Sequence, residues 1–234
     1  MKISGSAFMV NVPFFLALGL LLCGGLAAHA DESFAVLEGA ESPDHRYAVA
    51  WGVKGVADLD AHLKGSREPA PSDTIENYLL DVAGKKILAT LNSGYWPSQN
   101  HHSLEVVWSA DNKTVAVLNG GHWECDSFEA RRVLDDQAGP FCDLAKPLDA
   151  ALDAFLAKSF GAKYRKAREI SFTYSDLALG DEAIWRVKAT ASNLYAKTGT
   201  DFQQSAKIQF TIVKDGAMGL KVKILGKPQK LASP

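Results

Sequence analysis

Short stretches of alternating apolar and polar residues recur along most of this 234-residue chain, and turn-forming residues separate them. Such alternation predicts β-strands that bury one face and are joined as hairpins. The predicted strands are residues 47–51, 77–82, 85–91, 103–109, 114–120, 170–174, 183–191, 207–213 and 218–225. We therefore expect a mainly β chain, built as an antiparallel sheet or a sandwich of hairpins.

The side chains also predict how the strands pair in two of these hairpins. In the first, Ala83-Gly84 is suited to a two-residue turn, which places Asp81 opposite Lys86. In the second, a register with Trp108 opposite Val115 gathers the apolar residues on one face.

The last two strands predict a third hairpin, whose loop length follows from the apolar pattern. A three-residue loop, Lys214-Asp215-Gly216, puts Phe210 opposite Leu220, whereas a two-residue loop mixes apolar and polar faces. Gly216 is then expected in the left-handed conformation.

One helix is expected over about residues 147–160. Pro147 suits the first helical position, and Gly161 offers a stop. Apolar residues recur between them at helical spacing: Leu148, Ala151, Leu152, Phe155 and Leu156. This spacing indicates an amphipathic helix that lies on a sheet. The fold is thus expected to be α+β, with a hairpin-rich part (31–143) and a helix plus C-terminal sheet (144–228).

The first thirty residues have the layout of a secretory signal peptide. Lys2 precedes an apolar stretch, and Ala28-His29-Ala30 places small residues where a signal peptidase reads the chain. We expect cleavage after Ala30, which leaves residues 31–234 as a single globular domain in the periplasm or outside the cell. Stable membrane insertion after cleavage is not expected.

The balance of charged residues and the absence of certain catalytic motifs exclude several classes of function. The chain has 25 Lys and Arg against 27 Asp and Glu, and this balance argues against a nucleic-acid partner, which needs a basic surface. The sequence contains neither a phosphate-binding glycine loop nor a nucleophile elbow. No cofactor is therefore expected.

Two cysteines remain after cleavage, Cys125 and Cys142, with sixteen residues between them. In an oxidising compartment such a pair predicts a disulfide. Two free buried thiols are the alternative.

Two stretches, Ser42–Trp51 continuing in Asn77–Leu88, and Trp108–Val117, resemble blades of β-propeller repeats of the TolB or WD type. In that family a Ser-Pro-Asp-Gly turn leads into an apolar strand, and an Asp-x-x-x-Gly-Lys hairpin follows. This chain has His45 and Asn112 in place of the glycine. The resemblance implies a propeller-like arrangement of hairpins. The two turns lie 67 residues apart, against about 40–45 for a propeller blade, so we expect an open sheet or sandwich.

Candidate metal ligands lie at the open end of the second hairpin. If the strands stay paired that far, His101 faces His122, and Glu124 follows two residues on. Two imidazoles and a carboxylate are a donor set for zinc or copper. The alternative is that these histidines are solvated loop residues.

Aromatic residues gather at the same end of the hairpin, namely Tyr95, Trp96 and Trp123. Exposed rings beside hydrogen-bonding side chains suit a sugar or peptide surface. The alternative is that the two tryptophans fill the core. Together these features favour a non-enzymatic exported module that binds a ligand or a protein partner in the cell envelope. The alternative function is a metal-dependent or hydrolytic envelope enzyme that uses His101, His122 and Glu124.

Overall fold

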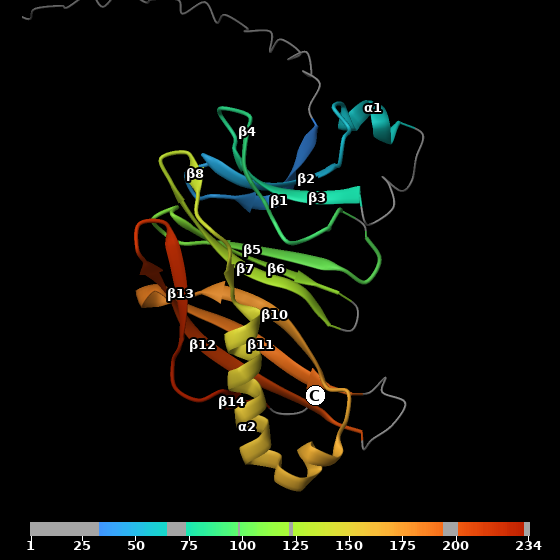
Figure 1. Cartoon of the computed structure of the whole chain (residues 1–234), viewed down its shortest axis with the longest axis vertical. Coiled ribbons are helices and arrows are strands. Elements are labelled where there is room, and N and C mark those ends of the chain that lie inside the picture. The colour runs from blue at the N-terminus through green and yellow to red at the C-terminus, as the bar shows by residue number, and fades with distance from the viewer. Residues whose placement is uncertain (1–32, 65–73, 98, 122–123, 194–200, 232–234) are drawn as a thin grey trace, which may run out of the picture. The chain divides into compact units, whose positions relative to one another are not determined.

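The computed structural model shown in Figure 1 describes residues 33–64, 74–97, 99–121, 124–193 and 201–231. Residues 31–234 form one compact unit. The predicted leader, residues 1–30, lies outside the described residues. The described part is mainly β, as the sequence predicts, and its strands form three antiparallel sheets.

The first sheet is a four-stranded meander in the order β1-β2-β3-β4. Its elements are β1 (Phe34–Glu41), β2 (Tyr47–Val53), the short helix α1 (Leu59–Leu63), β3 (Ile75–Asp81) and β4 (Lys86–Thr90). The second sheet repeats the meander in the order β5-β6-β7-β8, and β9 pairs with β7. Its strands are β5 (Ser103–Trp108), β6 (Thr114–Gly120), β7 (Cys125–Leu134), β8 (Gln137–Ala138) and β9 (Cys142–Asp143).

A long helix, α2 (Ala145–Lys166), leads to the third sheet, which has the order β10-β11-β12-β13 with β14 paired to β12. Its strands are β10 (Ser171–Leu179), β11 (Ile184–Ser192), β12 (Gln203–Asp215), β13 (Gly219–Ile224) and β14 (Gln229–Lys230). The helix is longer than the predicted 147–160. Gly161 interrupts it with a φ of +48°, so the predicted stop is a kink.

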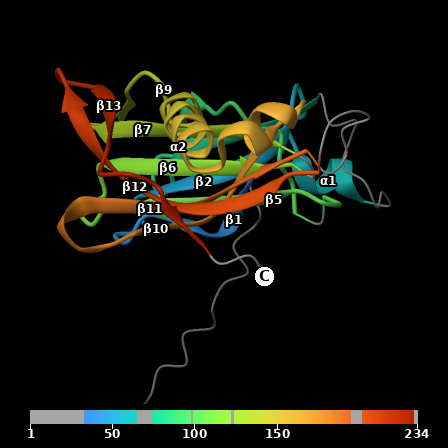
Figure 2. The same ribbon diagram turned by 90° about the horizontal axis from the view of Figure 1, so that it is seen from below.

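The second sheet is buried on both faces, because it lies between the first sheet on one side and α2 with the third sheet on the other (Figure 1). In the view from below, α2 lies in front of β6 and β7 (Figure 2). Val115 and Val117 of β6 belong to a core shared with the first sheet. Ala116 and Leu118, which alternate with them, belong to a second core shared with α2 and the third sheet. A strand that is buried on both faces needs consecutive apolar residues, and β6 has them from Val115 to Leu118.

Two predicted registers are confirmed. Asp81 pairs with Lys86 across the β3–β4 turn, and Trp108 pairs with Val115 across the β5–β6 turn. In the β3–β4 turn Lys85, and not Gly84, has the positive φ, +48°.

The predicted register of the C-terminal hairpin is wrong by four residues. Phe210 pairs with Ile224 and not with Leu220, and the three-residue loop runs from Gly216 to Met218. Gly216 has a φ of +72°, as expected. The observed register suits a glycine at position 219, because an added Cβ there would lie 2.3 Å from the carbonyl oxygen of Asp215. Both registers keep the apolar residues on one face, so the apolar pattern did not separate them.

The predicted disulfide is also wrong, since Cys125 and Cys142 are both free. Cys142 of β9 pairs with Ala130, five residues along β7 from Cys125. At about 3.3 Å per residue this register separates the two cysteines by roughly 16 Å along the strand. A disulfide requires Cα atoms within about 7 Å, so the pairing of β9 excludes it.

The turns that carry the propeller resemblance, β1–β2 and β5–β6, have the same hydrogen bonds. The hydroxyl of Ser42 donates to Asp44 Oδ1 at 2.6 Å, and that of Ser109 donates to Asp111 Oδ1 at 2.6 Å. These bonds hold the pKa of each carboxyl below its usual value. The first two sheets are therefore similar in strand order and in their first turn.

Candidate functional site

The loop that carries Tyr95 and Trp96 is held by one buried amide, Asn77 of β3. Asn77 Oδ1 accepts hydrogen bonds from the Ser93 hydroxyl at 2.5 Å and from the Tyr95 backbone N–H at 2.8 Å. Its Nδ2 donates to the Tyr95 carbonyl at 2.9 Å. A side chain that both donates to and accepts from the Tyr95 peptide fixes this part of the loop on the sheet.

A cavity of about 340 Å³ lies next to this loop, between β1 and β5. The described residues that line it are Leu37, Glu38, Gly39, Ala40, Tyr95, Pro97, Leu104 and Val106. Most of these side chains are apolar, and Glu38 carries the one formal charge among them. We call this space the Tyr95 cavity.

The irregular middle of β1 forms one wall of the Tyr95 cavity. Between the pairs Val36–Ala50 and Glu41–Ala48, β1 has three more residues than β2 has, and Gly39 there has a φ of +71°. Such bulges redirect side chains and are frequent next to binding sites. The indole N–H of Trp108 donates to the Ala40 carbonyl at 3.1 Å, which ties this wall to β5.

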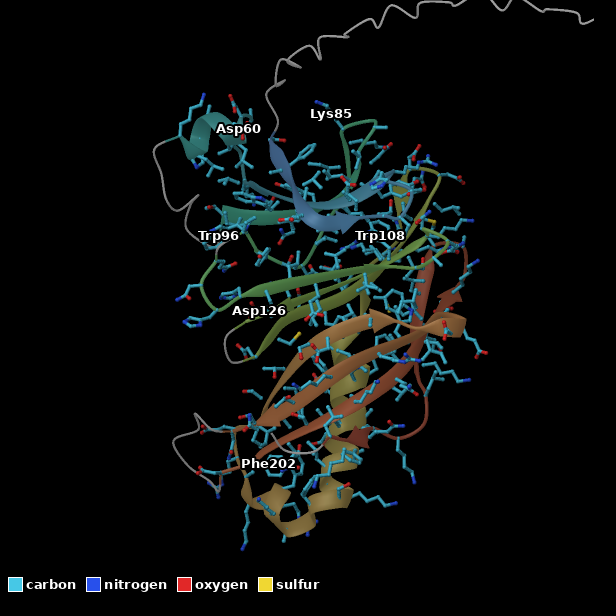
Figure 3. All side chains as sticks on the ribbon, turned by 180° about the vertical axis from the view of Figure 1, so that it is seen from behind. Asp60, Lys85, Trp96, Trp108, Asp126 and Phe202 are labelled. Carbon is cyan, nitrogen blue, oxygen red and sulfur yellow. The ribbon has the colours of Figure 1, made fainter. Side chains whose placement is uncertain are left out.

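Trp96 lies at the end of the first two sheets, whereas Trp108 lies between them (Figure 3). Both Tyr95 and Trp96 are half-buried and pack against the core that these sheets share. Trp96 thus has part of its surface free for a ligand and part committed to the fold. Trp123, the third aromatic residue of the predicted patch, lies outside the described residues.

The predicted metal ligands are described only in part, because His122 lies outside the described residues. His101 is exposed and has a φ of +62°, and Glu124 is exposed as well. The described pairing of β5 with β6 ends at Ser103 and Gly120, so it does not extend to His101. In the ranges that the structure describes, no three His, Cys, Asp or Glu side chains gather as a metal site.

The structure brings together two pairs that the sequence did not reveal. His102 Nδ1 lies 3.1 Å from Asp126 Oδ2, near the same end of the sheets as Trp96. Glu105 accepts hydrogen bonds from the backbone N–H groups of Asp176, at 3.2 Å, and Leu177, at 2.7 Å. Glu105 thereby fixes a bulge of β10 against β5. Each pair joins residues at least 24 positions apart, so local patterns give no signal for it.

Within the part of the chain that the structure describes, none of the helices combines the length and the apolar character that a membrane crossing needs. In comparisons with known proteins, no family model and no curated sequence matches this chain. The geometry of the site therefore carries the functional argument.

Proposed function

We propose that this chain is an exported, non-enzymatic binding module of the cell envelope, and that its ligand enters the Tyr95 cavity. The observation that carries the proposal is the lining of that cavity. Most of its described side chains are apolar, and the exposed carboxylate of Glu38 is the one formal charge among them. This combination favours an apolar or aromatic group that bears a positive charge, such as an aromatic amine or a basic side chain beside an apolar one.

The walls of the Tyr95 cavity are held in place before any ligand arrives. Asn77 fixes the Tyr95 peptide, and the Trp108 indole fixes the bulge at Ala40. A site whose walls are already ordered loses little conformational entropy on binding. Trp96 and His101 stay in the proposal as residues that a larger ligand or a protein partner would contact. His122 and Trp123 stay in it as well, although they lie outside the described residues.

The alternative function, an envelope enzyme that uses His101, His122 and Glu124, has no comparable support. His101 and Glu124 join no ligand cluster in the described ranges. Nothing in the described part of the chain favours this enzyme over a binding module.

The test is a titration of the mature protein with phenethylamine and with phenylacetate, followed by NMR chemical shifts. The two probes share a ring and differ in the sign of their charge. Phenethylamine should shift the signals of Leu104 and Val106 in a saturable way. Glu38→Gln should weaken the affinity for phenethylamine by about tenfold, the effect of one charge-assisted contact. The matched control is Asp60→Asn, which removes an exposed carboxylate from α1 and should leave binding unchanged.

Equal binding of phenylacetate, or equal weakening by both variants, would overturn the assignment of Glu38. No saturable shift at the cavity with either probe would overturn the site itself. Export is tested separately by N-terminal sequencing of protein from the periplasmic fraction, which should begin at Asp31.

A further inference from the structure

A second groove, independent of the Tyr95 cavity, lies between α2 and the segment that follows β13. One stripe of the helix lines it with Ala151, Ala154, Phe155 and Lys158. The other side is lined by Ile224, Gly226, Lys227 and Pro228. Its volume is about 380 Å³, within the usual range for small-molecule sites. We call it the α2 groove.

The sequence explains why this groove is open. The core-facing stripe of α2 is formed by Leu148, Leu152 and Leu156, which are fully buried. The neighbouring stripe carries alanines at 151 and 154, which are too short to fill the space up to residues 224–228. The groove is therefore apolar, and two of its lining residues, Phe155 and Ile224, also pack against the core that α2 shares with the second and third sheets.

The charged side chains that line the α2 groove are basic. The charged residues among its described lining are Lys158 and Lys227, and both are exposed. The Lys230 ammonium lies nearby along the chain, 5.0 Å from the centre of the Phe160 ring. Asp153, on the same helix, accepts a hydrogen bond from the Tyr164 hydroxyl at 2.6 Å.

Positive charge is in excess over the whole C-terminal part of the chain. Residues 144–234 contain 15 Lys and Arg against 8 Asp and Glu, whereas residues 31–143 contain 9 against 19. The near-zero total charge conceals this division. A ligand for the α2 groove should therefore be apolar along its length and negatively charged at one end.

We propose that the α2 groove binds the acyl chain of a fatty acid. The chain lies along Ala151, Ala154 and Phe155, and the carboxylate is held by Lys158 and Lys227. The small side chains admit the methylene groups, and the two ammonium groups offset the cost of desolvating the carboxylate.

The experiment is isothermal titration of the mature protein with dodecanoate below its micelle concentration. Dodecyltrimethylammonium, which has the same chain and the opposite charge, is the first comparison. Dodecanoate should bind at one site per chain, and the cation should bind at least about tenfold more weakly, as expected for one lost charge-assisted contact. Phosphatidylglycerol vesicles, with no free fatty acid, are the second comparison, and the protein should not sediment with them.

Three variants locate the site. Lys158→Glu and Lys227→Glu should each weaken dodecanoate binding by about tenfold or more. Lys146→Glu changes the charge in the first turn of the same helix, outside the groove, and should leave the affinity unchanged. Ala154→Trp, at an exposed position, should fill the groove and remove binding while the circular dichroism spectrum stays that of the parent.

The proposal is wrong if the cation binds as well as dodecanoate does, or if Lys146→Glu weakens binding as much as Lys158→Glu does. Sedimentation of the protein with the vesicles would overturn the proposal, because it would show that the lysines around the α2 groove bind a membrane surface and not a free fatty acid. None of these outcomes bears on the Tyr95 cavity, which is tested with other probes and other residues.

Discussion

The Tyr174 hydroxyl of β10 donates a hydrogen bond to the Asp149 carboxylate of α2. Burial raises the pKa of both groups, and the Asp149 carboxylate raises the pKa of Tyr174 further. Asp149 also adds to the effect of burial at Cys125, whose pKa is raised to about 12. These residues bring α2, β7 and β10 together, so the helix is attached to the sheets through a carboxylate that is costly to ionise.

The raised pKa of Asp149 predicts a specific pH dependence of stability. The native state keeps the Asp149 proton to a higher pH than the unfolded chain does, where the pKa is 3.8. Its contribution to stability is therefore complete below the unfolded pKa and is lost as the pH rises through the native pKa. The free energy of unfolding by urea, compared between the parent and Asp149→Asn from about pH 3 to 7, should fall with rising pH in the parent relative to the variant. A constant difference would contradict this prediction.

A buried ion pair within β7 should be one of the most sensitive positions in the fold. Glu129 Oε2 accepts from Arg131 Nε at 3.0 Å, and their side chains are 2% and 13% exposed. Arg131 also donates to the Thr90 carbonyl at 3.1 Å, which joins the second sheet to the first. Glu129→Gln should lower the free energy of unfolding by about 3 kcal/mol, because it leaves the guanidinium buried without its counter-charge.

The control for this ion pair is Asp136→Asn. Its carboxylate accepts from Arg46 at 2.6 Å, but their side chains are 41% and 50% exposed, so the pair is weakened by solvent. This change should shift the urea midpoint little. Equal losses in the two variants would show that burial does not decide the strength of these pairs.

The sequence predicted most local features, although not the register of the C-terminal hairpin, and it predicted distant contacts poorly. The pairings of Asp81 and Trp108 followed from neighbouring residues, because turn length and apolar alternation restrict the register of a hairpin. Glu129 and Arg131 sit two apart on β7 but owe their burial to the first sheet, which no local pattern encodes. The same holds for the Tyr95 cavity, because the bulge in β1 and its contact with β5 join distant parts of the chain.

The two free cysteines predict that the protein is insensitive to reducing agent. Dithiothreitol should leave the melting temperature of the mature protein unchanged, and the denatured protein should titrate two thiols. In the native protein both thiols should react slowly with a thiol reagent near pH 8, because burial raises the pKa of Cys125 and Cys142 and little thiolate is present. A lower melting temperature under reducing conditions would show that a disulfide does form.

The two equivalent turns allow a matched test of backbone strain. His45 and Asn112 occupy the same turn position with φ values of +57° and +58°. A left-handed residue with a side chain costs about 1–2 kcal/mol, except that asparagine tolerates this conformation, and glycine adopts it freely. His45→Gly should therefore raise the free energy of unfolding by about 0.5–1 kcal/mol, even after the entropy that glycine loses on folding.

Asn112→Gly should change the free energy of unfolding by less than His45→Gly does, because Asn112 already suits the conformation. The His45 contact with Glu41 at 2.5 Å does not alter this expectation, since the two side chains are 77% and 41% exposed and such pairs contribute little. Urea unfolding of both variants at one pH checks the order. If Asn112→Gly stabilises the protein more than His45→Gly does, then histidine is not more strained than asparagine at this turn position, and the two turns are alike in hydrogen bonding alone.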